Sequence, residues 1–468
     1  MSHTISRRSF IGFSLLVGGC SALPVPSGLK TDPWQRAADI RNSVSEPNIP
    51  DREFSVLDYG ALGDGEFLNT FAFADAINAC AAAGGGRVVV PEGHFLTGAI
   101  HLRSNIELHL EADAVILFST DPEDYPLVYS RYEGVELYNY SPLIYAKNSQ
   151  NVAVTGKGVL HGQAADENWW SWCGSPRFGW AEGMPRQHED RDKLFAQAEA
   201  GVPVGQRVFG SGHYLRPSLI EFYNCRNVMV EGVSLKDSPF WNIHPVLCRD
   251  VIVRGVTVTG QGPNNDGCNP ESVDGMLIDD CYFDTGDDCI AIKSGRNADG
   301  RRLATPSQNI VISGCQMRAG HGGVVIGSEI SGGVHHVFAE NCQMDSPDLW
   351  YALRFKNNAM RGGKVEDIYA RDIEVGQVAF AAITCDFNYE EGADGPFVPE
   401  LNNLVVERLQ VKQAGRVLDS QGLPGAPVRN IKLIDCSFDG VTDPSIVTQT
   451  RGLVLDNVRV NGEQVSSL

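Results

Sequence analysis

Three aspartates lie in two glycine-containing turn segments of similar form. Asn264-Asn265-Asp266-Gly267 is followed further along the chain by Gly286-Asp287-Asp288-Cys289. Carboxylates held close together resist ionising together, which raises the pKa of at least one of them. A protonated carboxyl beside ionised carboxylates is what cleavage of a glycosidic bond requires. Taken alone, the three acids fit a calcium site or an exposed acidic ridge equally well.

Basic side chains follow these acids at equal intervals along the chain. His321 of Gly320-His321-Gly322 is as far from Asp288 in sequence as Arg354 of Arg354-Phe355-Lys356 is from His321. A histidine between glycines is usually a turn residue, and an isolated Arg-x-Lys is usually solvated. Four motifs in register are harder to explain in that way. A face with acids in the middle and His, Arg and Lys beside them suits a ligand that is both a sugar and an anion.

A repeated strand template positions these motifs. Each copy has alternating apolar residues, two turn residues and a final apolar residue pointing inward. Strong copies cover residues 227–233, 250–256, 275–281, 309–315, 336–342 and 430–436, with weaker ones at 152–156 and 453–458. The steps from one strong copy to the next are unequal, whereas the template itself is constant. This combination is typical of a solenoid whose coils share one core and carry variable loops.

The repeat predicts an all-β, single-domain parallel β-helix, because each coil has room for strand and turn but not for a helix. Equivalent positions on neighbouring coils lie about 4.8 Å apart, so Asp266 is expected to project from the same face as Asp287 and Asp288. Two adjacent aspartates share a face only at a bend, which Gly286 permits. One short helix is expected to cap the N-terminal end of the β-helix, over residues 70–83, with Asn69 or Thr70 at its N-cap.

Composition excludes several classes of partner. The 468 residues contain 38 Lys and Arg against 58 Asp and Glu, a formal net charge of −20, so nucleic acid and anionic membranes are not expected partners. The 12 cysteines show no metal-binding spacing. Four of them share the final inward position of the template, where stacking as small apolar residues is favoured over disulfide bonding; they are Cys281, Cys315, Cys342 and Cys436.

The N-terminal segment, 1–30, has the form of an export signal and tether, and Pro24, Pro26 and Pro33 are assigned to the tether. Ser6-Arg7-Arg8-Ser9-Phe10-Ile11 has the twin-arginine pattern, and an apolar run over positions 11–19 follows it. Val17-Gly18-Gly19-Cys20 resembles a lipobox, in which the cysteine is acylated; the alternative is simple cleavage near Ala22. We therefore expect an exported protein, either a periplasmic or outer-membrane lipoprotein anchored through Cys20 or a secreted protein, with the β-helix domain at 50–465.

The sequence strongly resembles the polygalacturonase family, family 28 of the glycoside hydrolases, over roughly residues 50–460. The four signatures of that family are Asn-Thr-Asp, Gly-Asp-Asp, Gly-His-Gly and Arg-Ile-Lys, in this order. Here they read Asn264-Asn265-Asp266, Gly286-Asp287-Asp288, Gly320-His321-Gly322 and Arg354-Phe355-Lys356. Flanking segments are similar too, namely Asp58-Tyr59-Gly60-Ala61, Ser238-Pro239-Phe240-Trp241 and Ile326-Gly327-Ser328-Glu329. Asn265 and Phe355 depart from the signatures, and Met317 stands where fungal members have the disulfide partner of Cys289, so Cys289 is expected to be free.

The resemblance implies a right-handed parallel β-helix of the pectin-lyase type that cleaves α-1,4-galacturonosyl linkages in pectic polysaccharide or oligogalacturonides. It implies inversion of configuration, with carboxyl groups about 6.5–9.5 Å apart, no metal or other cofactor, and a monomer. Asp287 would be the general acid, while Asp266 and Asp288 would activate water. His321 would support the acid or bind substrate. Arg354 and Lys356 would hold the galacturonate carboxylate, with Asn264 as a further substrate contact.

Further segments look like the bacterial members, many of which are exo-acting: Pro270-Glu271-Ser272, Ile292-Lys293-Ser294-Gly295-Arg296-Asn297 and Gly327-Ser328-Glu329. An insertion at about 162–214 carries four tryptophans, Trp169, Trp170, Trp172 and Trp180. It is expected to wall one end of the cleft; the alternative is a surface flap. Rhamnogalacturonan or xylogalacturonan hydrolysis, a calcium-dependent β-helix lyase and a non-catalytic carbohydrate-binding β-helix are the competing functions.

Overall fold

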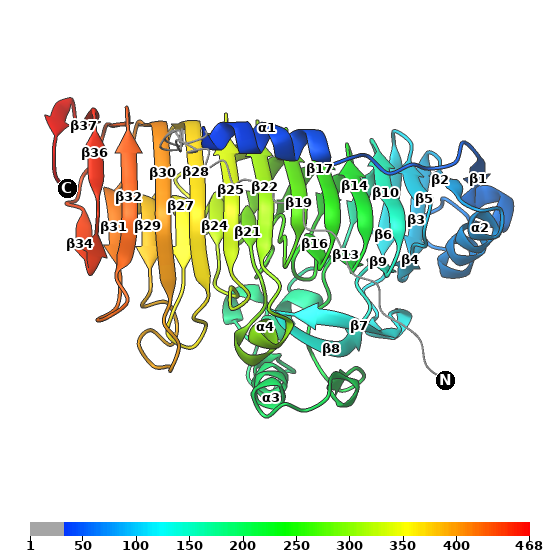
Figure 1. Cartoon of the computed structure of the whole chain (residues 1–468). Coiled ribbons are helices and arrows are strands. Elements are labelled where there is room, and N and C mark those ends of the chain that lie inside the picture. Colours follow the sequence, from blue (N-terminus) through cyan, green and yellow to red (C-terminus); the bar gives the residue numbers. More distant parts are fainter. Residues whose placement is uncertain (1–31) are drawn as a thin grey trace, which may run out of the picture.

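The structure, a computed structural model, describes residues 32–468 and forms an elongated cylinder of stacked parallel strands (Figure 1). The predicted export signal and Cys20 lie outside the described residues. In the described part of the chain, no helix has the length and apolar character needed to cross a membrane. The parallel β-helix predicted from the sequence repeat is confirmed.

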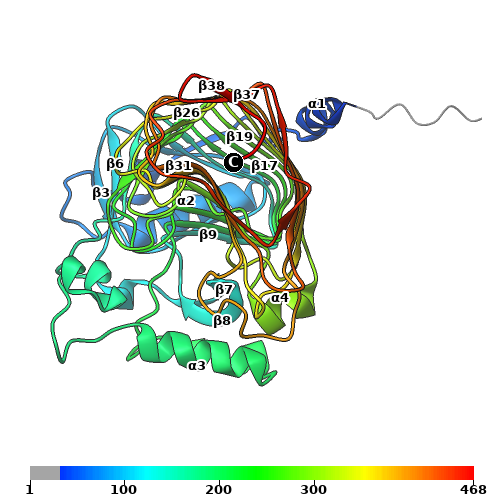
Figure 2. The same ribbon diagram turned by 90° about the vertical axis from the view of Figure 1, so that its left-hand side faces the viewer.

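Each complete coil contributes three strands, and these stack into long walls (Figure 2). The first wall contains β1 (Glu53–Ser55), β2 (Gly86–Val90), β5 (Ile106–Leu110), β10 (Gln150–Gly156), β14 (Arg226–Glu231), β17 (Arg249–Arg254), β19 (Asp274–Asp279), β22 (Ser307–Ser313), β25 (Val334–Glu340), β28 (Lys364–Val375), β30 (Glu400–Val411), β32 (Val428–Ile434), β35 (Thr450–Arg451) and β36 (Val454–Asp456). The long strands β28 and β30 continue into the second wall, where they pair with β26 and β33.

The second and third walls follow in each coil. The second contains β3 (Gly93–Thr97), β6 (Ala114–Phe118), β11 (Val159–His161), β15 (Ser234–Lys236), β18 (Thr257–Gly260), β20 (Tyr282–Thr285), β23 (Gln316–Met317), β26 (Gln343–Met344), β33 (Ser437–Phe438), β37 (Val458–Val460) and the terminal β38 (Glu463–Val465). The third consists of β4 (Ile100–His101), β9 (Ile144–Lys147), β13 (Ile220–Tyr223), β16 (Ile243–Val246), β21 (Ile290–Ile292), β24 (Val324–Ile326), β27 (Tyr351–Lys356), β29 (Ala381–Asp386), β31 (Arg416–Gln421) and β34 (Ile446–Thr448).

The sequence template corresponds to the first wall. Its inward positions are in register from coil to coil, so that Val228 pairs with Val251, then Met276, Ile310 and Val337. These side chains are fully buried in one continuous apolar core. The structure adds coils that the repeat analysis did not identify, at β2 and β5 before the first copy and at β28 and β30 between the later ones.

The stacked cysteines are buried thiols. Cys281, Cys315 and Cys342 occupy consecutive coils at the same inward position, and Cys436 occupies it further along. All the cysteines within residues 32–468 are unpaired. The predicted role as small apolar core residues is therefore confirmed, and Cys289 is free as expected.

Two helices cover surfaces of the cylinder, and the sequence predicts one of them. The expected helix is α2 (Thr70–Ala82), which covers the N-terminal end of the cylinder. Its N-cap residue Asn69 does not cap the helix; the Asn69 side chain instead bonds to the backbone of Leu62, Phe67 and Leu96. The sequence analysis did not predict α1 (Pro33–Ser43), which packs Trp34, Ala37 and Ile40 against the outside of the first wall.

A cluster of non-repeat elements stands beside the third wall (Figure 2). It comprises the hairpin of β7 (Leu127–Tyr132) and β8 (Val135–Tyr140), the short β12 (Val208–Phe209), and helices α3 (His188–Glu199) and α4 (Asn297–Leu303). Helix α3 belongs to the tryptophan-rich insertion, for which the sequence predicts no helix. Within that insertion Trp169 is buried in the main core, so the insertion is anchored to the cylinder by packing.

Candidate active site

The four sequence motifs converge on the third wall and the turns that precede it. Asp266 lies in the connection between β18 and β19, and Asp287 with Asp288 lies between β20 and β21. His321 lies between β23 and β24, and β27 itself carries Arg354 and Lys356. All six side chains line one pocket of about 370 Å³. The register inferred from the motif spacing is therefore correct.

The three carboxylates form one cluster. One oxygen each of Asp266, Asp287 and Asp288 lies within 4.8 Å of the others. This is closer than the separation of about 6.5–9.5 Å expected from the resemblance, because Asp287 and Asp288 are neighbours in one turn and Asp266 lies on the adjacent coil, at strand spacing. A Cβ on Gly286 would lie 2.3 Å from the carbonyl oxygen of Gly262. Gly286 is thus required by the close approach of two coils as well as by the bend.

His321 pairs with the most accessible of the three acids. Its Nδ1 lies 2.9 Å from Oδ1 of Asp287. The indole of Trp350 stacks on the imidazole with ring centroids 3.8 Å apart. The side chain of Asp287 is 18% exposed, against 4% and 1% for those of Asp266 and Asp288. Asp287 and His321 are therefore the members of the cluster that a bound ligand meets first.

Asp288 is held by both basic residues of the fourth motif. Lys356 Nζ donates to Asp288 Oδ2 at 2.7 Å, and Arg354 Nη1 lies 3.5 Å from Asp288 Oδ1. Arg354 also donates to the carbonyl oxygen of His321 at 3.3 Å. The two residues expected to hold a substrate carboxylate thus also neutralise Asp288. Arg354 is the more accessible of the two and keeps further guanidinium donors for a ligand.

The first motif has a structural and a site-facing residue. Asn264 lines the pocket, where its Oδ1 accepts a hydrogen bond from Arg216 Nη2 at 2.7 Å. Asn265 is fully buried and donates to the carbonyl oxygens of Ser238 and Phe240 at 2.8 and 3.0 Å. The departure from the family signature at Asn265 therefore falls on a residue that fixes the turn and not on one that reaches the pocket.

The cylinder contributes two charged pocket residues that are not among the site residues predicted from the sequence. Lys293 Nζ lies 3.1 Å from Glu329 Oε2 and 3.8 Å from Asp266 Oδ2, and it stands over the ring of Trp241. Both Lys293 and Glu329 belong to the segments that resemble the bacterial members. That likeness is the signal that could have identified them.

The outer wall of the pocket comes from the non-repeat elements. Glu133 lies at the β7–β8 turn, Arg191 on α3, and Glu390 on the segment after β29. Arg296 is buried beside them and ion-pairs with Glu133 at 3.5 Å and with Glu390 at 3.2 Å. No repeat signal marks these segments. Helix α3 brings the insertion to the pocket through Arg191, whereas the tryptophans of the insertion serve mainly to pack it.

The charges of the cluster set where its protons reside. Burial, followed by the charge of Asp287, raises the pKa of Asp266 to about 8. Burial also opposes ionisation of Asp287, but the hydrogen bond and charge of His321 outweigh it and lower the pKa of Asp287. Burial disfavours the imidazolium, whereas Asp287 stabilises it and raises the pKa of His321. The raised carboxyl pKa that the sequence predicts therefore falls on Asp266 and not on Asp287, the expected acid.

Asp266→Asn is expected to stabilise the folded protein at neutral pH. The folded-state pKa of Asp266 is raised above its unfolded value of about 3.9, so folding takes up a proton between these values and stability falls as pH rises from 4 towards 8. At pH 7 the raised pKa of Asp266 lowers the folding stability by up to about 4 kcal/mol. An amide does not ionise, so it removes this loss of stability, and it can keep the hydrogen bond with Asn269. Urea unfolding at pH 4 and pH 7 measures the effect.

The gain should vanish at pH 4, where the carboxyl is protonated in both states. Asp280→Asn, the same change in an exposed turn, serves as control and should alter neither value. An Asp266→Asn variant that loses equal stability at both pH values would contradict the assignment of the shared proton to Asp266.

A parallel β-helix that carries paired acids in a cation-rich pocket defines a class of polysaccharide-processing enzymes. The sequence profile described as "Glycosyl hydrolases family 28" matches residues 210–440. A probable polygalacturonase of Vitis vinifera is 31% identical over 398 residues, which cover 81% of this chain and 72% of the relative. The chain belongs to family 28 of the glycosyl hydrolases and is a glycoside hydrolase.

Two further relatives are named for exo-acting enzymes. The exo-poly-alpha-D-galacturonosidase of Dickeya chrysanthemi is 29% identical over 354 residues, which cover 72% of this chain and 57% of that relative. The chain thus spans little more than half of the Dickeya protein. The crystal structure of a hyperthermoactive exopolygalacturonase from Thermotoga maritima superposes with a TM-score of 0.90 at 46% identity, covering 93% of this chain and 97% of that one.

Proposed function

We propose that the protein hydrolyses α-1,4-galacturonosyl linkages of pectic polysaccharide or oligogalacturonides, releasing galacturonate from a chain end. The observation that carries this proposal is a carboxylate cluster in a pocket that also holds Arg354, Lys356, Lys293 and Arg191. The acids suit glycosidic cleavage, and the cations suit a sugar with a carboxylate. The names of the Thermotoga and Dickeya relatives support the same substrate and the exo mode.

In this proposal Asp287 protonates the leaving glycosidic oxygen. It is the carboxyl most open to the pocket and is paired with His321. Substrate bound over Asp287 excludes water and adds a negative charge, and both effects raise a carboxyl pKa. The proton that Asp266 holds before substrate binds then moves to Asp287. The two carboxyl groups are electrostatically coupled, because the charge of Asp287 raises the pKa of Asp266.

Asp266 and Asp288 hold the attacking water. Carboxylate oxygens less than 4.8 Å apart can both accept hydrogen bonds from one water between them. Once Asp266 has given up its proton it can take one from this water. Arg354 binds the substrate carboxylate through its remaining donors, Lys356 holds Asp288 in place through its ion pair, and Asn264 contributes a further polar contact to the sugar.

Exo action follows from the outer wall. The β7–β8 hairpin, α3 and the segment after β29 each place a charged side chain at the pocket, and Arg296 joins them through ion pairs. A substrate chain that cannot pass this wall presents its non-reducing end to it. The reducing-end portion then leaves by the open side, past His321 and Trp350.

The lyase alternative requires calcium and a basic proton abstractor. The ammonium groups of Lys356 and Lys293 already stand 2.7 and 3.8 Å from the acids that would bind such an ion. Calcium sites also use six to eight oxygen ligands, whereas this cluster brings together three carboxylates. These contacts favour hydrolysis.

Product analysis on defined oligogalacturonides tests the proposal. Monogalacturonate should appear from the first turnovers, and the viscosity of polygalacturonate should fall slowly relative to the rise in reducing ends. A broad early ladder of oligomers would contradict exo action and leave hydrolysis intact. An unsaturated, ultraviolet-absorbing product abolished by a chelator would establish the lyase, and binding without new reducing ends would establish a non-catalytic protein.

We also propose that the protein is exported through its twin-arginine signal and acylated at Cys20. The signal pattern and lipobox at residues 6–20 support this proposal. Membrane fractionation of wild type and Cys20→Ser tests it: only the wild type should be recovered with membranes.

A further inference from the structure

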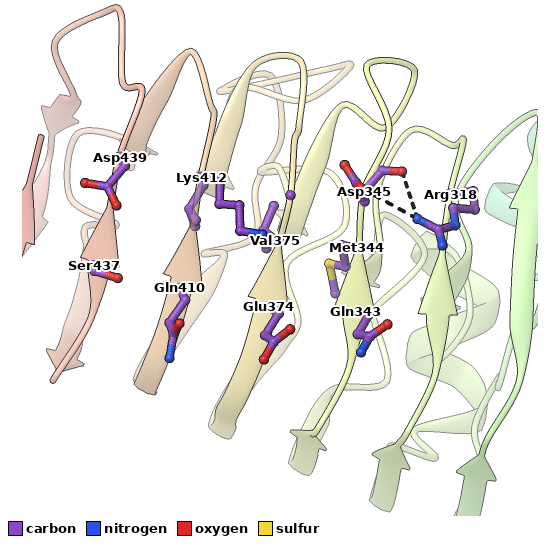
Figure 3. Close-up of a pocket in the computed structure, with 12 residues that line it drawn as sticks. Arg318, Gln343, Met344, Asp345, Glu374, Val375, Gln410, Lys412, Ser437 and Asp439 are labelled. Atoms are coloured by element: carbon purple, nitrogen blue, oxygen red, sulfur yellow. Dashed lines mark hydrogen bonds and ion pairs between the residues drawn. The ribbon is translucent and has the colours of Figure 1, made fainter.

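The open side of the pocket leads along the cylinder into two connected hollows. A channel of about 850 Å³ shares His321 and Trp350 with the pocket. A groove of about 470 Å³ in turn shares Arg318 and Asp345 with the channel and crosses successive strands of the second wall (Figure 3). A substrate longer than the pocket leaves by this side and lies over these hollows.

Carboxylates outnumber cations along this route. Apart from His321, which pairs with Asp287, the cations are Arg177, Arg318 and Lys412, and the carboxylates are Asp284, Asp345, Asp348, Glu374 and Asp439. Arg318 is partly neutralised, because its Nη1 lies 3.8 Å from Asp345 Oδ2 (Figure 3). The route away from the pocket therefore lacks the excess of positive charge that a long polyanion needs.

Asp284 and Asp348 are the uncompensated acids of the channel. The side chain of Asp348 has neither an ion pair nor a hydrogen bond within residues 32–468; only its backbone is bonded. Asp284 accepts a hydrogen bond from Gln261 at 2.9 Å and has no cation within ion-pair distance in the same part of the chain. Within residues 32–468, neither carboxylate has a cation within ion-pair distance to offset its repulsion of an anionic ligand in the channel.

We propose that this enzyme selects short oligogalacturonates over the polymer, with Asp284 and Asp348 as specificity-determining residues. The inference rests on the proposed function. A galacturonate in the pocket meets Arg354 and Lys356, whereas each further unit in the channel brings its carboxylate towards like charges. Repulsion between exposed like charges lowers the rate of productive encounter and is screened by salt.

This selectivity places the enzyme after another reaction. Its substrates are short chains with free non-reducing ends, and a class of reaction that cuts the polymer internally must supply them. The formal net charge of −20 acts in the same direction, since it repels a long polyanion as a whole.

The test compares kcat/KM, expressed per non-reducing end, for trigalacturonate and for polygalacturonate at two ionic strengths. At 0.01 M salt, where the Debye length is about 30 Å, kcat/KM for the polymer should be about tenfold lower than kcat/KM for the trimer. At 0.1 M salt, where it is about 10 Å, the difference should shrink to about threefold. A double variant that combines Asp284→Asn with Asp348→Asn should also narrow the difference between polymer and trimer at 0.01 M salt to about threefold.

Asp75→Asn provides the matched control, because Asp75 is exposed on α2 at the N-terminal end of the cylinder. It changes the net charge but not the channel, and it should leave the tenfold difference in place. A polymer kcat/KM equal to or above that of the trimer at 0.01 M salt would overturn the inference. So would a double variant that behaves like Asp75→Asn. Failure to release galacturonate from any oligomer would overturn the proposed function as well.

Discussion

Asp287→Asn is expected to lower kcat on trigalacturonate by at least about a thousandfold. General acid catalysis contributes about 10²–10⁴-fold to a rate, and the amide also loses the ion pair with His321. The amide keeps the size of the side chain and the acceptor for the backbone N–H of Asp288. Binding of galacturonate and the melting temperature should therefore change little. Product quantification, calorimetric titration and circular dichroism measure the three quantities.

The choice of substrate separates an acid from a merely structural residue. An aryl galacturonide whose leaving group is already acidic departs without protonation, so Asp287→Asn should lose far less activity on it than on trigalacturonate. Asp266→Asn, which removes the proposed base for water, should lose similar amounts on both. Asp280→Asn serves as the unchanged control. Near-wild-type kcat for Asp287→Asn on trigalacturonate would exclude Asp287 as the acid.

The central residues of the site could be predicted because each lies at a fixed place in a repeating coil. Constant strand spacing turns sequence distance into spatial distance, so the spacing of the motifs alone places Asp266 and Asp287 on neighbouring coils. The location of the proton could not be predicted in the same way. Asp266 and Asp287 are chemically identical, and only their unequal burial and the contact of Asp287 with His321 distinguish them.

The residues of the pocket's outer wall could not be predicted from the repeat spacing. Glu133, Arg191 and Glu390 come from a hairpin, a helix and a loop that interrupt the repeat, and their meeting depends on how these long segments fold back. Arg296, which joins them, is buried and charged, and its partners lie far away in sequence. Periodicity carries no information about such contacts.

In the fold, too, the repeating coils could be predicted from the sequence, whereas helix α1 could not. Inward positions of the coils are uniformly apolar and produce the strand template, whereas α1 has only a narrow apolar stripe that matches the outside of the first wall. Asp32 caps α1, and Pro33 occupies its first turn, where proline is favoured. The prediction that Pro33 belongs to an extended tether is therefore wrong, because the surface that α1 covers exists only after the coils have stacked.

Lys356→Met is expected to lower kcat/KM on trigalacturonate by about a hundredfold to a thousandfold. Lys356 Nζ lies 2.7 Å from Asp288 Oδ2, and the Asp288 side chain is 1% exposed. Without the ammonium group, Asp288 keeps only the longer contact with Arg354, at 3.5 Å. Removing one partner of a buried ion pair costs about 3–5 kcal/mol of folding stability, so the melting temperature of Lys356→Met should fall as well. Lys157→Met, in an exposed turn, is the control and should have no effect.

Combining Lys356→Met with Asp288→Asn separates the structural part of this effect from the chemical part. The double variant leaves neither an unpaired buried carboxylate nor a lone ammonium group, so the melting temperature should recover most of what Lys356→Met alone loses. Activity should not recover, because the proposed water-holding carboxylate is gone. If stability and kcat/KM return together, Lys356 and Asp288 serve only to support the fold, and the attacking water must be held by Asp266 alone.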